Sequence, residues 1–275
     1  MKLPGVVGIG FFMIAAGTRV AADVSVSNDG LRATYEEPSR RLILAPRTSG
    51  ASFAACDHFA PVDATVNAVT VNDKTFGKGK GLEVVHTNGQ RDQVLLFPNK
   101  PFFFFRTTLK NGNAQTVTNR VAFQALTLNL GLPSSALNTL GTGGLLKPDK
   151  NPGSYMWTAV ADPASRRGAV AGWVTTDRGS GIVRMDVTHD VIRLLPHVDY
   201  GRLLLAPSQS TTLETFAVGF FDDVRLGLET YADTIAEIYA IRLPPHADRP
   251  LHVVCGRRFA RKRIDRPHRL CRADA

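Results

Sequence analysis

The sequence predicts a mainly β protein: an antiparallel β-sandwich, followed by one helix and a disordered basic tail. Apolar and polar residues alternate with a period of two through much of residues 23–221, which is typical of strands with one buried face. Turn-forming residues separate these short runs. A single stretch after residue 222 has apolar residues at helical spacing. Many short strands without intervening helices favour a sandwich.

Residues 1–22 have the order of a secretory signal peptide. Lys2 supplies a positive start, residues 6–16 are apolar, and small residues at 20–22 form a cleavage site before Asp23. The apolar stretch is too short to span a bilayer, and its glycines disfavour the alternative of a buried core helix. We therefore expect a secreted or periplasmic protein that is not held in a membrane after the signal is removed.

Three runs carry the strand pattern most clearly. Apolar and polar residues alternate through residues 183–188, and large apolar residues alternate with small ones through 216–220. In residues 121–130 the apolar parity changes near Ala125 and Leu126, which predicts a β-bulge there. The four phenylalanines at 102–105 predict a strand that is buried on both faces.

Turn residues mark the ends of the strands. Asn88-Gly89 separates two apolar runs and predicts a hairpin. Residues 177–181 are also interpreted as a hairpin turn, and residues 207–210 separate two further runs.

The predicted helix lies within about residues 224–240, where Leu228, Tyr231, Ile235 and Ile238 recur at helical spacing. Asp222 or Asp223 is the expected N-cap. Two prolines at 244 and 245 end the helical pattern, so residues 222–245 form a helix and linker after the sandwich domain of residues 23–221.

No self-sufficient catalytic centre is visible. Gly179-Ser180-Gly181 lacks the spacing of a nucleophile elbow, and the glycine run at 77–81 lacks the spacing and terminal hydroxyl of a phosphate-binding loop. The histidines have no metal-ligand spacing, and His189-Asp190 favours a structural role. The glycines at 141–144 fit a loop with unusual dihedral angles at least as well as a ligand site. We therefore predict no catalytic residue, no metal and no cofactor.

Four residues are the candidates for carbohydrate contact. Trp157 and Trp173 offer indole faces on which the C–H face of a sugar packs, and Asp177 and Arg178 offer groups that bind its hydroxyls. The alternative for both tryptophans is packing in the core.

The net charge of +9 comes mainly from the end of the chain. Residues 249–275 contain nine Lys or Arg and two acidic residues, whereas residues 23–248 are neutral. A basic run with one aromatic residue invites a nucleic-acid interpretation, but an exported protein with a neutral body argues against it. Cys255 and Cys271 also lie in this tail, and Cys56 lies in the body.

Several segments resemble a known family. Residues 159–168 (AVADPASRRG) and 171–181 (AGWVTTDRGSG) resemble the N-terminal β-sandwich of bacterial α-galactosidase-like (melibiase) glycoside hydrolases. Residues 228–233 (LETYAD) and 241–245 (IRLPP) resemble the helix and linker that lead into the catalytic (β/α)8 barrel of that family. The resemblance covers about residues 25–248 and implies a sandwich of the supersandwich type.

The tail departs from this family in a specific way. The family's barrel begins with a Cys-Thr-Trp-Tyr strand, a Gly-Gly-Ala-Ser loop and a Glu-Lys pair. The degenerate codons of residues 251–255, 256–259 and 261–263, shifted forward by one nucleotide, can spell Cys-Thr-Trp-Tyr, Gly-Gly-Ala-Ser and Glu-Lys-Glu. We therefore expect residues 246–275 to be an out-of-frame, disordered tail.

The resemblance implies the non-catalytic N-terminal domain of an exported enzyme acting on α-galactosides, inactive without its barrel, because the family's catalytic carboxylates lie on barrel strands. The expected partner is then an α-galactoside or related glycan. One alternative is a stand-alone carbohydrate-binding module, and another is an anionic-surface or nucleic-acid binder acting through the tail. The sequence leaves the sugar, the linkage and the oligomeric state open.

Overall fold

The computed structural model describes residues 23–113 and 116–242, and the chain divides into a unit of Met1–Tyr239 and a unit of Ala240–Ala275. The predicted signal peptide (1–22), the proline linker at 244–245 and the predicted tail (246–275) lie outside the described residues. Within the described residues, no helix is long and apolar enough to cross a membrane.

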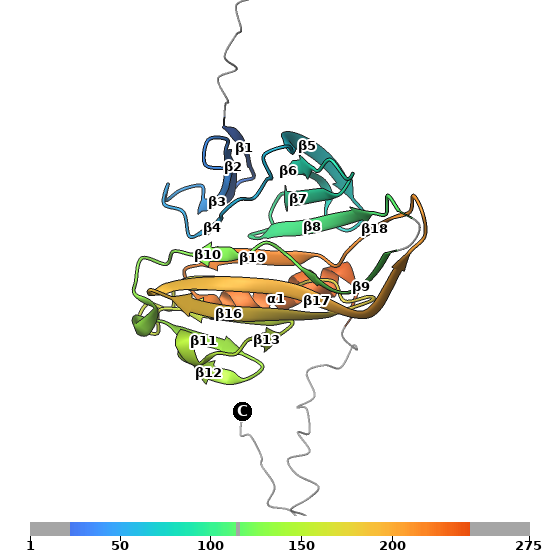
Figure 1. The fold of residues 1–275 in the computed structure, drawn as a ribbon. Coiled ribbons are helices and arrows are strands. Elements are labelled where there is room, and N and C mark those ends of the chain that lie inside the picture. Colours follow the sequence, from blue (N-terminus) through green and yellow to red (C-terminus); the bar gives the residue numbers. More distant parts are fainter. Residues whose placement is uncertain (1–22, 114–115, 243–275) are drawn as a thin grey trace, which may run out of the picture. The chain divides into compact units, whose positions relative to one another are not determined.

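The described strands form two antiparallel sheets, which confirms the predicted fold class (Figure 1). Sheet one has the order β1-β2-β3-β4-β10-β17-β16-β13, with β9 also paired to β17. Its strands are β1 (Val24–Ser27), β2 (Leu31–Glu36), β3 (Arg41–Pro46), β4 (Ala54–Cys56), β9 (Thr116–Ala122), β10 (Leu126–Leu128), β13 (Ser154–Tyr155), β16 (Ser180–Thr188) and β17 (Val191–Leu205).

Sheet two has the order β12-β11-β14-β15-β19-β8-β7-β6-β5, with β18 also paired to β8. Its strands are β5 (Thr65–Asp73), β6 (Gly77–Val85), β7 (Arg91–Leu96), β8 (Phe103–Lys110), β11 (Asn138–Gly141), β12 (Gly144–Leu146), β14 (Trp157–Ala161), β15 (Gly168–Trp173), β18 (Ser210–Thr212) and β19 (Phe216–Phe221). Two short 3-10 helices, η1 (Ser134–Ala136) and η2 (Pro148–Lys150), lie in the connections.

The main core lies between the sheets, and a second core lies on the opposite face of sheet two. Phe103 and Phe105 join the core that sheet one also supplies, whereas Phe102 and Phe104 join the second core. Because successive side chains of a strand point to opposite faces, this segment is buried on both sides, as its sequence predicts.

The helix α1 (Val224–Ile238) covers that second core and contacts β14, β15 and β19. Asp223 is its N-cap, and the carboxylate accepts a hydrogen bond from the backbone N–H of Arg225, which confirms one of the two predicted caps. Tyr231 fixes the helix on the sheet, since its hydroxyl donates to the carbonyl of Trp173 at 2.6 Å. Burial raises the pKa of the Tyr231 hydroxyl, which keeps it protonated as a donor.

The irregularity predicted near Ala125 and Leu126 is present. Ala122 on β9 pairs with His197 and Leu126 on β10 pairs with Leu194, so four residue steps lie opposite three steps of β17. One extra residue on one strand is the definition of a bulge, and here it also separates β9 from β10.

The two predicted hairpin turns have different outcomes. Asn88 and Gly89 do join β6 to β7 in an antiparallel hairpin, with Gly89 at φ 84°. Residues 177–181 are not a hairpin turn, because β15 pairs with β14 and β19 in sheet two while β16 pairs with β13 and β17 in sheet one. This segment is a crossover between the sheets, and turn residues alone do not distinguish the two arrangements.

Candidate functional site

Trp173 lies in the main core. Its side chain is completely buried, and its ring packs against Phe123 at 4.8 Å and Phe216 at 5.3 Å between ring centroids. The indole N–H donates to the carbonyl of Ile182 at 3.3 Å. Trp173 is therefore packed in the core, which is the second of the two alternatives that the sequence left open, and it presents no ring face to solvent.

Trp157 lies on the other face of sheet two from Trp173. It is partly buried and packs against the second core, beneath α1. Because one tryptophan faces the main core and the other the second core, they do not form one surface for a sugar ring.

Asp177 and Arg178 lie on the crossover between the sheets. Asp177 is exposed. Arg178 is held by a network: its backbone N–H donates to Glu214 at 3.0 Å, and its guanidinium donates to the hydroxyl of Thr211 at 2.7 Å. Glu214 is 2% exposed, and the Tyr200 hydroxyl also donates to it. The Arg178 guanidinium lies 3.5 Å from the buried Glu214 carboxylate and compensates its charge.

A pocket of about 220 Å³ opens between the two sheets, and we call it the interlayer pocket. Its apolar wall includes Phe59, Phe105 and Phe123, and its polar groups centre on Asp92. Asp92 is bonded to His86 at 2.6 Å and accepts hydrogen bonds from the Thr107 hydroxyl and the Gln90 amide. The carboxylate is therefore surrounded by donors from its own chain.

The side-chain amide of Gln124, at the edge of the interlayer pocket, is also hydrogen-bonded at both ends to groups of its own chain. Its amide oxygen accepts from the Cys56 thiol at 2.8 Å, and its amide nitrogen donates to the carbonyl of Phe59 at 2.6 Å. Burial, reinforced by Asp57 and Asp92, raises the pKa of Cys56 to about 12. The thiol is thus protonated at neutral pH, and Cys56 is a structural residue and not a nucleophile.

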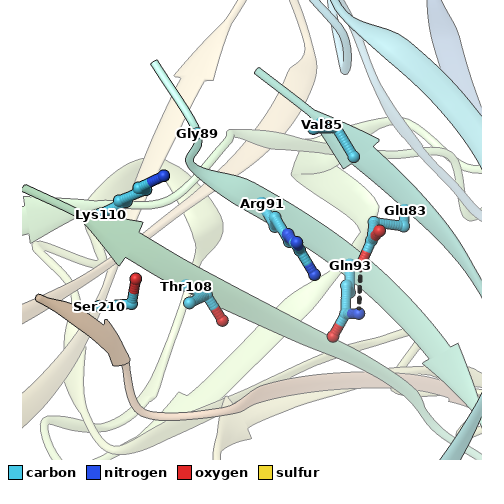
Figure 2. Close-up of a pocket in the computed structure, with 8 residues that line it drawn as sticks. All are labelled: Glu83, Val85, Gly89, Arg91, Gln93, Thr108, Lys110 and Ser210. Carbon is cyan, nitrogen blue, oxygen red and sulfur yellow. Dashed lines mark hydrogen bonds between the residues drawn. The ribbon is translucent and has the colours of Figure 1, made fainter. Parts of the chain in front are cut away.

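A second concavity, of about 410 Å³, lies on sheet two, and we call it the outer trough (Figure 2). It is on the same face of sheet two as α1, because Arg91 and Gln93 share the parity of Leu95 in the second core. The trough spans β6, β7, β8 and β18, whereas α1 packs on β14, β15 and β19. Its lining consists of Glu83, Val85, Gly89, Arg91, Gln93, Thr108, Lys110 and Ser210.

Strand register brings the trough residues together. Val85 and Thr108 lie directly across from Arg91 on either side, and Ser210 lies across from Lys110. Glu83 lies across from Gln93 and accepts a hydrogen bond from its amide at 2.8 Å. The two cations of the trough therefore have no carboxylate directly opposite.

The charges of the outer trough differ from those of its neighbours. Among the described residues, neither Arg91 nor Lys110 forms an ion pair. On the same face, Arg106 pairs with Asp73 at 3.0 Å. Burial by itself would raise the pKa of Asp73, but hydrogen bonds from the backbone of Thr75 and Phe76 and from Arg106 lower it below its usual value.

Sequence reasoning did not find the outer trough. Its members alternate along strands on either side of Asn88-Gly89, a pattern that predicts a solvated strand face as readily as a site. Which polar residues become cross-strand neighbours depends on register, and β18 joins β8 from about a hundred residues away in the chain. In the part of the chain that the structure describes, no three His, Cys, Asp or Glu residues gather as metal ligands.

No protein-family model and no curated protein sequence matches the chain. Solved structures are similar to it in fold. An α-galactosidase from Lactobacillus brevis matches with a TM-score of 0.53 and 11% identity, over 78% of this chain and 42% of that one. The α-N-acetylgalactosaminidase from Bifidobacterium bifidum matches in its GalNAc complex with a TM-score of 0.52 and 11% identity, over 78% and 39% of the two chains.

The chain spans about two fifths of the length of these enzymes. At such low identity the match shows the fold alone. The described part of the chain is therefore a two-sheet antiparallel sandwich whose fold is also found within these two enzymes.

Proposed function

We propose that this chain is the non-catalytic N-terminal domain of an exported α-galactosidase-like glycoside hydrolase and is inactive as it stands. The observation that carries this function is the unequal coverage: the match takes in 78% of this chain but only 42% of the α-galactosidase from Lactobacillus brevis. A sandwich with its helix corresponds to one part of such an enzyme, and the resemblance of residues 228–233 and 241–245 to the family's helix and linker supports a barrel after it.

The buried carboxylates of the sandwich support the inactive part of this proposal. A retaining glycosidase needs two carboxyl groups about 5–5.5 Å apart, one of them free to attack the sugar. Asp92 is bonded to His86, Gln90 and Thr107, and Glu214 is bonded to Tyr200 and Arg178. Carboxylates engaged in this way stabilise the sandwich and are not available as nucleophiles.

An assay with aryl α-galactosides tests the proposal. The 275-residue chain, purified free of host glycosidases, should hydrolyse them no faster than a control without enzyme. Turnover that survives that purification and follows the chain through gel filtration would contradict the proposal and would place a catalytic centre in the sandwich.

In the same proposal, residues 246–275 are an out-of-frame translation of the start of the barrel. The codons around residues 246–255, read one nucleotide forward and past codon 275, should continue into a barrel sequence that begins with Cys-Thr-Trp-Tyr. A gene with the frame restored should yield a longer protein with activity on an α-glycoside. Stop codons soon after the shift in the other frame would contradict this part.

A second candidate function is a stand-alone carbohydrate-binding module. The outer trough favours it, because hydroxyl, amide and charged side chains surround a concavity of about 410 Å³. Saturable binding of a saccharide to the chain, lost when trough residues are replaced, would support this function. Absence of binding to every saccharide tried at millimolar concentration would leave only the first candidate function, the non-catalytic N-terminal domain.

A further inference from the structure

We propose that the outer trough binds a sugar acid, with the carboxylate of the ligand held by Arg91 and its hydroxyls held by the neighbouring polar side chains. This inference does not depend on the place of the chain in a larger enzyme, since the trough consists of described residues of the sandwich alone.

The outer trough contains an arginine, Arg91, that forms no ion pair among the described residues. Opposite charges on one face of a sheet stabilise it, so an arginine there can be paired with a carboxylate of its own chain. Arg106 is paired in this way with Asp73 on the same face, and Arg106 lies directly across from Gln93, two residues after Arg91. Arg91 instead lies between Val85 and Thr108, and Glu83 is bonded to Gln93. Its five N–H donors are therefore open to a ligand.

Lys110 adds a second positive charge on the same face. Arg91 lies across from Thr108, and Lys110 is two residues further along β8, so the two are diagonal neighbours at about 7–8 Å in the backbone. Figure 2 shows the Arg91 guanidinium directed toward Gln93 and the Glu83 carboxylate, with Thr108 on its other side, and the Lys110 side chain directed toward Gly89. With Glu83 included, the lining has one net positive charge. A ligand with a single negative charge would neutralise this net charge of the lining.

The glycine of the hairpin turn gives Lys110 its room. Gly89 has φ 84°, and a Cβ there would lie 2.7 Å from Cδ of Lys110. A side chain at position 89 would thus both strain the turn and displace the lysine. The turn and the second cation are structurally coupled at one end of the trough.

The rest of the lining defines the ligand class. The Ser210 hydroxyl is suited to ligand hydroxyls, and so are the remaining donor and acceptor positions of Thr108, bonded to the Thr212 hydroxyl at 3.0 Å, and of Gln93, bonded to Glu83 at 2.8 Å. The volume of about 410 Å³ is at the lower end for small-molecule sites. The lining contains no aromatic ring, so a neutral sugar would find no stacking surface. Affinity must therefore come from charge, through a forked guanidinium–carboxylate contact, and this selects a sugar acid over a neutral sugar.

Titration of the full chain with D-galacturonate and with D-galactose tests the inference, because the two sugars differ in the carboxylate. Two-dimensional amide NMR should show saturable shifts for galacturonate at Val85, Gly89 and Ser210 and none for galactose. Arg91→Gln should weaken galacturonate binding about tenfold or more, and Lys110→Gln should weaken it less. Added salt should weaken binding to the unaltered chain, because the trough is open to solvent.

Two matched variants and two further anions complete the experiment. Arg32→Gln on β2 and Lys80→Gln on β6 remove the same charges at exposed positions outside the trough and should leave the affinity unchanged. Acetate and inorganic phosphate test whether a carboxylate or any compact anion is enough. Equal affinity for galacturonate, acetate and phosphate would overturn the sugar-acid class. Galactose binding as tight as galacturonate, no saturable shift, or an unchanged affinity in Arg91→Gln would overturn the site.

Discussion

The interlayer pocket and the outer trough are both concave and polar, but they use charge in opposite ways. In the interlayer pocket Asp92 is bonded to three donors of its own chain, and nearby Gln124 is bonded to Cys56 and Phe59. In the outer trough Arg91 and Lys110 have no acidic partner among the described residues. A charge withdrawn from water must be compensated inside the protein, whereas a charge on an exposed face is still solvated.

This difference separates structural polar groups from available ones. The Glu214 carboxylate, 2% exposed, recruits Tyr200 and Arg178 across a crossover between the sheets. Arg178, one of the predicted carbohydrate contacts, is held in this network by the buried carboxylate. The charged residues best suited to bind a ligand are those that the fold leaves exposed and without an oppositely charged partner.

The largest effect is expected from Trp173→Ala. Removing a fully buried indole from the main core should lower the free energy of unfolding by about 3–5 kcal/mol. Urea denaturation measures this change, and Trp173→Phe should restore part of the loss. A loss below about 1 kcal/mol would contradict the position of Trp173 in the main core.

Asp92→Ala should have an intermediate effect. It leaves the Thr107 hydroxyl, the Gln90 amide and His86 without their shared acceptor, so a loss of about 1–3 kcal/mol is expected in the same denaturation measurement. Asp177→Ala is the matched control, because Asp177 is exposed, and it should leave the midpoint unchanged. Equal effects of the two substitutions would contradict the distinction between compensated and exposed charge.

Asp73 gives a pH-dependent test on sheet two. Its folded pKa is lowered, so its contribution to stability is complete above the unfolded value of about 4 and is lost as the pH falls through the folded value. The stability difference between the unaltered chain and Asp73→Asn should therefore be largest at neutral pH and shrink below about pH 4. A difference that grows on acidification would contradict the ion pair with Arg106.

The smallest effect is expected from Arg91→Gln. Because Arg91 is exposed and unpaired, its removal should shift the thermal midpoint by no more than about 2 °C. Arg106→Gln is the matched comparison on the same face, and it should lower the midpoint further because it leaves Asp73 without its partner. Calorimetry of the two variants compares a compensated arginine with an open one directly.

The sequence by itself determined the features that depend on near neighbours in the chain. The period-two runs predicted the strands, the alternating environment of residues 102–105 was correctly predicted as burial on both faces, and Asp223 followed by helical spacing located α1. Asn88 and Gly89 also specified their hairpin, since a positive φ is a local demand that glycine meets.

Only the tertiary structure decided which strands lie side by side. Residues 177–181 have turn chemistry but connect the two sheets, and the two tryptophans face different cores although β14 and β15 are paired. The outer trough combines β6, β7 and β8 with β18, which returns to the sheet about a hundred residues later. Turn residues and periodicity act over a few positions, whereas strand order and register follow from burial summed over the whole sandwich, which no local pattern encodes.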